Sequence, residues 1–244
     1  MKKILTIAAL TVMTMSSGFA ASKTITHNIE ETKKASNAFS NHTDGVRISM
    51  GFSVLNYSKA KSNSGEWDLN SNDNSAYSDS VSTHVPLEFK IEKSFSVNHR
   101  LSTSTALRYA TAGSSTESKG DYNESSWNRE KLETKYNEYG LEQRIHLNLG
   151  NGPRFRPFIA FQVGITSIKT KDMDSSNYLE LKGIHTNIKT GGELCWKSGW
   201  YIETSIAYTR FNVNKISDND ESTSETNNLK LTGFNAGFNF GFAF

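Results

Sequence analysis

The chain has 244 residues, of which 36% are hydrophobic and 21% charged, with one cysteine and a formal net charge of +2. Its mean hydropathy is −0.54, and no run of about 20 apolar residues is present, which excludes a helical membrane protein. A lone cysteine excludes an internal disulfide. The near-neutral charge argues against nucleic-acid binding, which requires a clearly basic face.

The first 20 residues have the three parts of a cleavable export signal. Two lysines precede an apolar stretch over residues 4–15, and small Gly18 and Ala20 stand at the −3 and −1 positions of a cleavage site. Cleavage leaves a formal charge of (27 − 2) − 25 = 0. We therefore predict a signal peptide over residues 1–20, a polar periplasmic segment over 21–44 and a β-barrel domain over 45–244.

From residue 45 onward, apolar side chains recur at every second position over runs of about ten residues, which is the pattern of β-strands. Eight runs of this kind cover residues 46–54, 81–91, 101–109, 139–147, 159–165, 184–196, 200–208 and 234–244. Pro86 lies inside the second run and removes a ladder hydrogen bond, so we expect a β-bulge there.

The connections between these runs alternate in length. Long polar stretches cover residues 59–80, 112–131, 169–183 and 212–228, and short joints cover 93–99, 149–156 and 197–199. This rhythm is typical of bacterial outer-membrane barrels, which have long loops outside and tight turns in the periplasm. The sequence therefore predicts an all-β fold, an eight-stranded antiparallel up-and-down transmembrane β-barrel with four long extracellular loops and three short periplasmic turns.

The second face of the runs combines small residues with charges of both signs. We predict that these charges form a polar network in the lumen, made of Arg47, Glu88, Lys90, Glu92, Arg100, Arg108, Glu142, Arg144, Lys189, Glu193 and Glu203. The apolar face lacks charges across its middle, as a lipid face must, because Arg or Lys at the bilayer midplane costs ~2–4 kcal/mol. Alternation alone also fits a soluble barrel with its polar face in water.

Aromatic residues stand near the strand ends, as in the interfacial girdles of membrane barrels. We place the following on the lipid face: Tyr57, Tyr109, Tyr136 and Tyr208 toward the long loops, and Trp196 and Trp200 toward the short turns.

Phe240, Phe242 and Phe244 alternate up to the last residue. This pattern resembles the terminal strand of Gram-negative outer-membrane barrels, whose assembly machinery reads alternating aromatics that end in a C-terminal Phe. The chain as a whole resembles the OmpA/OmpX-like eight-stranded superfamily over residues 45–244. The resemblance implies residence in the bacterial outer membrane and two partners, the barrel-assembly machinery and the surrounding lipid with lipopolysaccharide.

The pattern favours a monomeric structural or surface-interaction protein, with adhesion or shielding carried by the long loops and a host or surface ligand as a further partner. Eight strands leave an interior only wide enough for side chains, so a general pore is disfavoured. Two alternatives stay open, a lipid-modifying outer-membrane enzyme and a narrow small-solute channel.

No catalytic, cofactor-binding or metal-binding residues can be assembled from the sequence, and we expect no cofactor. His84 and His185 fall toward the outer end of their strands, with Ser82 near the first, but a nucleophile, base and orienting group do not come together. The acidic stretch at residues 218–221 lacks the spacing and the glycine of a calcium loop.

Overall fold

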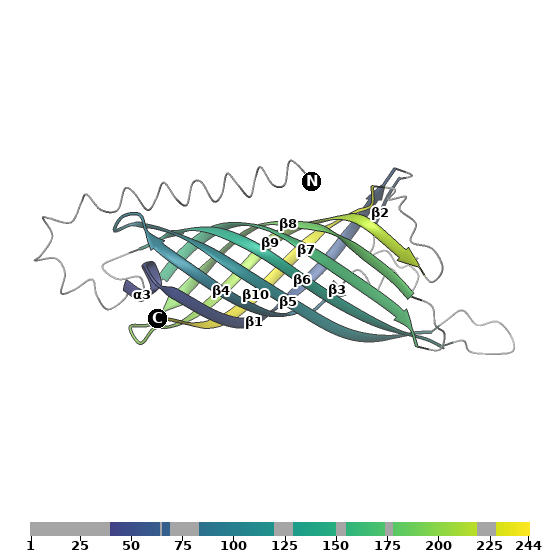
Figure 1. Ribbon diagram of the computed structural model, residues 1–244, viewed down its shortest axis with the longest axis horizontal. Coiled ribbons are helices and arrows are strands. Elements are labelled where there is room, and N and C mark those ends of the chain that lie inside the picture. Colours follow the sequence, from purple (N-terminus) through teal and green to yellow (C-terminus); the bar gives the residue numbers. More distant parts are fainter. Residues whose placement is uncertain are drawn as a thin grey trace, which may run out of the picture. The chain divides into compact units, whose positions relative to one another are not determined.

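The computed structural model describes residues 40–63, 65–68, 83–119, 129–149, 155–173, 178–218 and 228–244. They form one short helix and one antiparallel sheet (Figure 1). The elements are α3 (Ser40–Thr43), β1 (Val46–Ser62), β2 (Gly65–Asp68), β3 (Thr83–His84), β4 (Leu87–Ser96), β5 (Leu101–Lys119), β6 (Arg129–Leu147), β7 (Phe155–Asp172), β8 (Tyr178–Cys195), β9 (Trp200–Asp218) and β10 (Lys230–Ala243). The predicted signal peptide lies outside the described residues. No helix in the described ranges has the length and apolar content needed to cross a membrane.

The sheet closes on itself. Neighbouring strands pair in the order β10-β9-β8-β7-β6-β5-β4-β1, and β1 pairs with β10, with Met50 opposite Phe240. β3 and β4 are two parts of one barrel strand alongside β1, and β2 folds back on the outer end of β1. The described strands therefore form an eight-stranded up-and-down barrel, which confirms the predicted fold class. Closure leaves no sheet edge in the ring.

The two ends of the barrel differ. In Figure 1, α3 and the C-terminus lie at one end, and β2 lies at the opposite end. Because short turns mark the periplasmic side of outer-membrane barrels, we assign the end with α3 to the periplasm. The end with β2 is then the extracellular end.

The predicted bulge at Pro86 is wrong. Phe52 faces Leu87 and Leu55 faces His84, so both strands advance by three residues and the register is unbroken. The Ser53 backbone N–H donates to the Pro86 carbonyl at 3.0 Å, while proline has no N–H to return. The proline thus removes one hydrogen bond between the two strands without shifting their pairing. The hydrogen-bonded pairing between β4 and β5 ends at the same place, next to Pro86.

The strands are longer than the runs of alternating apolar residues from which they were predicted. β5 and β6 each have 19 residues and pair from Leu101 opposite Leu147 to Lys119 opposite Arg129. Most of the long loop predicted over residues 112–131 is therefore strand. A tilted strand spans the bilayer in about 9–11 residues. Beyond that height the outward face of the sheet is polar, so the outward apolar alternation ends while backbone pairing continues.

Two bulges lie near the extracellular end. On β1 the pairing with β10 steps from Tyr57 to Lys59, which leaves Ser58 as the extra residue. On β9 the pairing with β8 skips Asn214. Each bulge changes which residues point inward, so on β1 the buried positions shift from Tyr57 to Ala60.

The turn between β8 and β9 is built on a glycine. The Gly199 backbone N–H donates to the Trp196 carbonyl at 3.1 Å, and Gly199 has φ +93°, a conformation that L side chains rarely adopt. This is a three-residue hairpin loop that ends in a left-handed glycine. A Cβ at this position would stand 2.7 Å from the Ala243 carbonyl oxygen.

Gly199→Ala is expected to lower the free energy of unfolding by about 1–2 kcal/mol, because the left-handed conformation is costly for a residue with a Cβ. Urea unfolding of the barrel in lipid vesicles, followed by tryptophan fluorescence, measures the change. Ser198→Ala in the same turn is the matched control and is expected to change stability by less than about 0.5 kcal/mol. Equal effects of the two substitutions would contradict this explanation.

Candidate functional site

The interior of the barrel is lined by charged side chains. Of the eleven residues predicted for the lumen network, ten are buried inside the ring: Arg47, Glu88, Lys90, Glu92, Arg108, Glu142, Arg144, Lys189, Glu193 and Glu203. Their exposed fractions lie between 0% and 4%. The structure brings these ten together into ion-pair networks that cross the barrel.

Arg100 does not join them. It is exposed and stands one residue before β5, in the turn that follows β4. The Asn98 side chain accepts the backbone N–H groups of Arg100 and Leu101 at 2.8 and 2.9 Å. This turn directs Arg100 away from the barrel, so the alternation that holds for Ser102 and Ser104 does not extend to it.

Glu138 and Arg156 were missed by the sequence prediction. Both are buried in the interior, with exposed fractions of 1% and 0%. Each lies two positions before an inward-facing residue of the same strand. Extending the predicted alternation by one inward position toward the N-terminus would therefore have included both. With them, the buried interior of the described residues holds six bases and six acids, so its charges balance.

Arg144 is the centre of the periplasmic half of the network. Its Nη1 and Nη2 donate to the two carboxylate oxygens of Glu203 at 2.6 and 2.8 Å, a bidentate pair. Nη1 also lies 3.3 Å from Glu193 Oε1, and Nε donates to Glu142. The guanidinium stacks 4.4 Å above the ring of Phe158. One side chain on β6 thereby ties together carboxylates from β6, β8 and β9.

Other cations share these carboxylates. Arg47 bridges Glu92 at 2.9 Å and Glu193 at 2.8 Å, while it lies 4.0 Å above the Tyr201 ring. The further ion pairs include Lys90 with Glu203 at 2.6 Å, Lys189 with Glu142 at 2.8 Å and Arg156 with Glu193 at 3.1 Å. Every buried carboxylate of this half therefore has at least one cationic partner.

A separate charged layer lies nearer the extracellular end. Arg108 donates to both oxygens of Glu88, at 3.2 and 2.5 Å, and to Glu138. Gln162 donates to Glu138 at 2.6 Å, and the Tyr136 hydroxyl donates to the same carboxylate. One arginine thus pairs with two carboxylates from different strands.

Above this layer the interior is apolar. Buried side chains from seven strands form one cluster: Leu55, Tyr57, Ala60, Ala110, Tyr136, Ile168, Leu181, Phe211, Val213 and Leu231. Tyr57 and Tyr136 are 0% and 1% exposed, so their predicted place on the lipid face is wrong. Both stand at inward positions of their strands, and the Tyr136 hydroxyl contacts the charged layer below.

The helix α3 lies against the periplasmic end of the network. His42 is 1% exposed, and its Nε2 lies 2.9 Å from the Trp196 carbonyl oxygen. Arg156 Nη1 donates to the His42 carbonyl at 2.6 Å. The His42 ring packs edge-on against Tyr201, with the centroids 6.1 Å apart. Part of the segment predicted as a polar periplasmic stretch thus docks on the barrel.

Docking of α3 is expected to weaken as the pH falls. Burial lowers the pKa of His42 from 6.5 to about 4, although the Trp196 carbonyl and Glu193 raise it and Arg47 and Arg156 lower it further. The undocked histidine binds a proton below about pH 6.5 and the docked one only below about pH 4, so docking is fully favoured above 6.5 and is lost as the pH falls toward 4.

A nitroxide on Thr43→Cys, in a Cys195→Ser background, reports the docking by its mobility. We expect the mobile population to rise about tenfold between pH 7.5 and pH 5. His42→Gln keeps a donor for the Trp196 carbonyl and is expected to remove the pH dependence. A pH-independent spectrum in the His42 protein would contradict the expectation.

Glu92, His146 and Glu193 offer metal-ligand atoms within 4.8 Å of one another. Their surroundings do not suit a divalent cation. Both carboxylates pair with Arg47, and Arg144 lies 3.3 Å from Glu193. An added metal would meet these buried guanidinium groups at close range, so we assign the cluster to the ion-pair network and not to a metal centre.

The two histidines weighed for catalysis also belong to the interior. His84 is 3% exposed, and its ring lies 5.1 Å from that of Tyr136. His185 is 1% exposed, with Nδ1 3.6 Å from Glu138 Oε2. Ser82 lies outside the described residues. Neither ring is presented to lipid at the outer rim, where a lipid-modifying enzyme needs its base.

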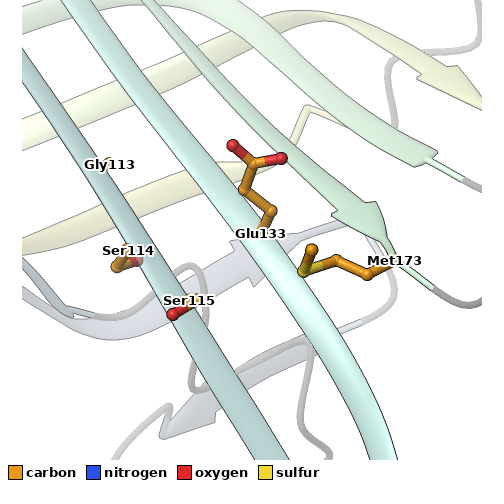
Figure 2. Close-up of a pocket in the computed structure, with 5 residues that line it drawn as sticks. All are labelled: Gly113, Ser114, Ser115, Glu133 and Met173. Carbon is orange, nitrogen blue, oxygen red and sulfur yellow. The ribbon is translucent and has the colours of Figure 1, made fainter.

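A shallow pocket of about 320 Å³ lies on the outer part of the strands. Figure 2 shows its lining, Gly113, Ser114 and Ser115 on β5, Glu133 on β6 and Met173 after β7. The Glu133 carboxylate already pairs with Lys135 at 3.1 Å. Two serine hydroxyls are then the remaining polar side-chain groups of the lining.

The outer face of the barrel is apolar. Isoleucines and leucines that a soluble barrel would bury point outward, as Ile165 and Leu107 do with 67% and 64% exposure. Aromatic rings mark both edges of this band. Tyr109 and Tyr139 lie 4.9 Å apart toward the extracellular end, and Trp200 stacks on Phe240 at 4.8 Å toward the periplasm. Trp196 and Trp200 thus stand at the lipid edge, as predicted.

A closed antiparallel barrel with an apolar outer band, aromatic edges and paired charges inside is the architecture of an integral outer-membrane β-barrel protein. The apolar outer band and the closed ring of strands indicate insertion in the bacterial outer membrane, as the sequence predicts. The soluble alternative is excluded because it requires the opposite orientation of the two faces.

Comparison with protein-family models and with curated proteins gave no match. Among solved structures, the chain is similar to Neisserial surface protein A, with 11% identity and a TM-score of 0.45 over 82% of this chain and 100% of the other. It is also similar to OprG of Pseudomonas aeruginosa, with 13% identity and a TM-score of 0.47 over 84% and 99%. Ail of Yersinia pestis, in a complex with a heparin analogue, has 12% identity and a TM-score of 0.43 over 82% and 100%.

Proposed function

We propose that this protein is a monomeric surface barrel whose role, adhesion or shielding, is carried by its extracellular part. One observation carries the proposal: the interior is filled. The twelve buried charges are at most 4% exposed, an apolar cluster lies above them, and α3 lies against the periplasmic end. A water-filled channel would expose its charges, so the interior supports a structural role.

The extracellular part is a continuation of the sheet. β5 and β6 pair over all 19 of their residues, about twice the length that a bilayer-spanning strand requires. The paired extension of these two strands ends well beyond the membrane surface. A stiff extension of this kind suits the presentation of a loop to a ligand outside the cell.

Loop replacement tests the proposal. Lys119 and Arg129 are directly paired, so an Asn-Gly turn can replace residues 120–128 without changing the register of β5 and β6. Lys171 and Tyr178 allow the same exchange for residues 172–177. We expect at least one replacement to lower the binding of expressing cells to epithelial cells or matrix, or to raise access of surface-binding antibodies to neighbouring proteins.

Ser198→Ala in a periplasmic turn is the matched control, and the shift between unheated and boiled samples in SDS gels verifies that each variant is folded. Unchanged adhesion and unchanged antibody access in every replacement would overturn the proposed role.

Conductance measurements address the channel alternative. The purified protein in a planar bilayer is expected to give no steady conductance, because the ion pairs and the apolar cluster occupy the interior. Regular conductance steps from the folded protein would favour the channel and contradict the structural role.

A further inference from the structure

Three pairs of lysines stand directly opposite each other on neighbouring strands. They are Lys61 with Lys230, Lys135 with Lys169, and Lys182 with Lys215. Within each pair both residues are at outward positions, opposite the buried ones. Directly opposed like charges destabilise a sheet, and side chains so placed can come within a few ångströms of a common point.

The surroundings neutralise only one lysine of each pair. Lys61 lies 3.8 Å from Glu66, Lys135 lies 3.1 Å from Glu133, and Lys182 lies 2.8 Å from Glu180. Among the residues that the structure describes, no carboxylate lies within ion-pair distance of the other three, which are Lys169, Lys215 and Lys230. Each pair therefore keeps an excess positive charge.

The pairs share one height, just beyond the apolar band. Lys135 precedes the outward Tyr139 by four residues, and Lys169 lies four residues beyond the outward Ile165. On β10, Lys230 precedes the outward Phe234 by four residues. Four residues of a tilted strand rise about 9–10 Å, which is the level of lipid headgroups above the hydrocarbon core.

We propose that the three lysine pairs bind phosphate groups on the anionic glycolipid of the outer leaflet, one phosphate between the two ammonium groups of each pair. The inference goes beyond the proposed surface role, which depends on the loops. A phosphate supplies the negative charge that each pair lacks, and lysine binds phosphate as a point charge. Attraction between a basic surface group and anionic lipid is worth about 1 kcal/mol per lysine.

Position favours a membrane lipid over a soluble polyanion. The pairs point sideways from the barrel wall and belong to six different strands, β1, β6, β7, β8, β9 and β10. Lipids packed around the wall can reach all of them at once. A chain that binds from outside the cell would meet the strand ends and loops first.

The test uses the full-length protein folded in a neutral detergent and two probes, lipid A with both phosphates and lipid A without phosphate. Lysine-to-glutamine variants of one pair, Lys135→Gln with Lys169→Gln, and of all six lysines are compared with wild type. Lys93→Gln with Lys197→Gln, two exposed lysines at the periplasmic end, is the control matched in charge.

We expect wild type to bind the phosphorylated lipid more tightly than the phosphate-free lipid. The two-lysine variant should bind phosphorylated lipid about thirtyfold more weakly, and the six-lysine variant should lose the preference. The periplasmic control should bind like wild type. Without lipid, the variants should melt at the same or a higher temperature, because the repulsion has been removed.

Three results would overturn the inference. Wild type could bind both lipids equally, or the periplasmic control could lose as much affinity as the paired lysines do. Soluble heparin could also displace the phosphorylated lipid at equal phosphate and sulfate concentration, which would indicate a polysaccharide partner. None of these outcomes depends on the loops, so they are distinguishable from a failure of the adhesion or shielding role.

Discussion

Replacing Arg144 by methionine is expected to lower the free energy of unfolding by about 3–5 kcal/mol, the usual cost of removing one partner from a buried ion pair. The guanidinium is fully buried and makes a bidentate pair with Glu203, at 2.6 and 2.8 Å, and contacts with Glu142 and Glu193. Methionine fills much of the volume but leaves the interior with five bases and six acids. Urea unfolding in lipid vesicles measures the loss.

Two further variants isolate the cause. Arg144→Lys keeps the charge but cannot form a bidentate pair, so we expect a smaller loss than with methionine. Arg100→Gln removes an arginine from the exposed turn and is expected to change stability by less than about 0.5 kcal/mol. A methionine variant within 1 kcal/mol of wild type would show that the network tolerates an unbalanced charge.

The period-two alternation was sufficient to predict the architecture. A strand between lipid and a packed lumen must place apolar and polar side chains on opposite faces. That requirement is local, so it can be read from any run of ten residues, such as Tyr139 to Leu147. The alternating loop lengths then supply the up-and-down order, and closure of β1 on β10 follows from it.

Strand ends were harder to predict, for a physical reason. Outside the bilayer the outward face of a strand contacts water, so the outward apolar signal stops before the hydrogen bonding does. Residues 112–119 look like loop and pair as strand. Glu138 and Arg156 were missed because the predicted strands began at Tyr139 and Ile159, ten and four residues after β6 and β7 begin. Arg100 was wrongly included because a tight turn reverses the chain at that residue.

Tyr57 and Tyr136 were placed on the wrong face because a general expectation about aromatic residues was preferred to the alternation of each strand. Aromatic girdles suggested the lipid face, whereas the parity of each strand already indicated the interior. The ion-pair partners could not be predicted at all. Arg144 and Glu203 are 59 residues apart in sequence, and which strands face each other across the lumen depends on barrel stagger.

Replacing Arg108 by methionine is expected to cost about 3–5 kcal/mol as well, because Glu88 and Glu138 lose their shared arginine. This layer differs from the one around Arg144. Among the described residues, the one other ion-pair partner of these two carboxylates is His185, 3.6 Å from Glu138, and the apolar cluster lies directly above. Two carboxylates would then face each other with little compensation.

A variant that also neutralises the two carboxylates distinguishes the effect of the Arg108 charge from the effect of its packing in the lumen. Combining Arg108→Met with Glu88→Gln and Glu138→Gln removes the whole ion-pair group, so no carboxylate is left in the layer without its arginine. The interior as a whole then holds five bases and four acids. Neutral replacements of a whole buried ion-pair group are often close to neutral in stability, so we expect this triple variant to recover most of the loss. The same urea unfolding experiment measures it. If the triple variant stays as unstable as Arg108→Met alone, Arg108 stabilises the barrel by filling the lumen and not by balancing its charge.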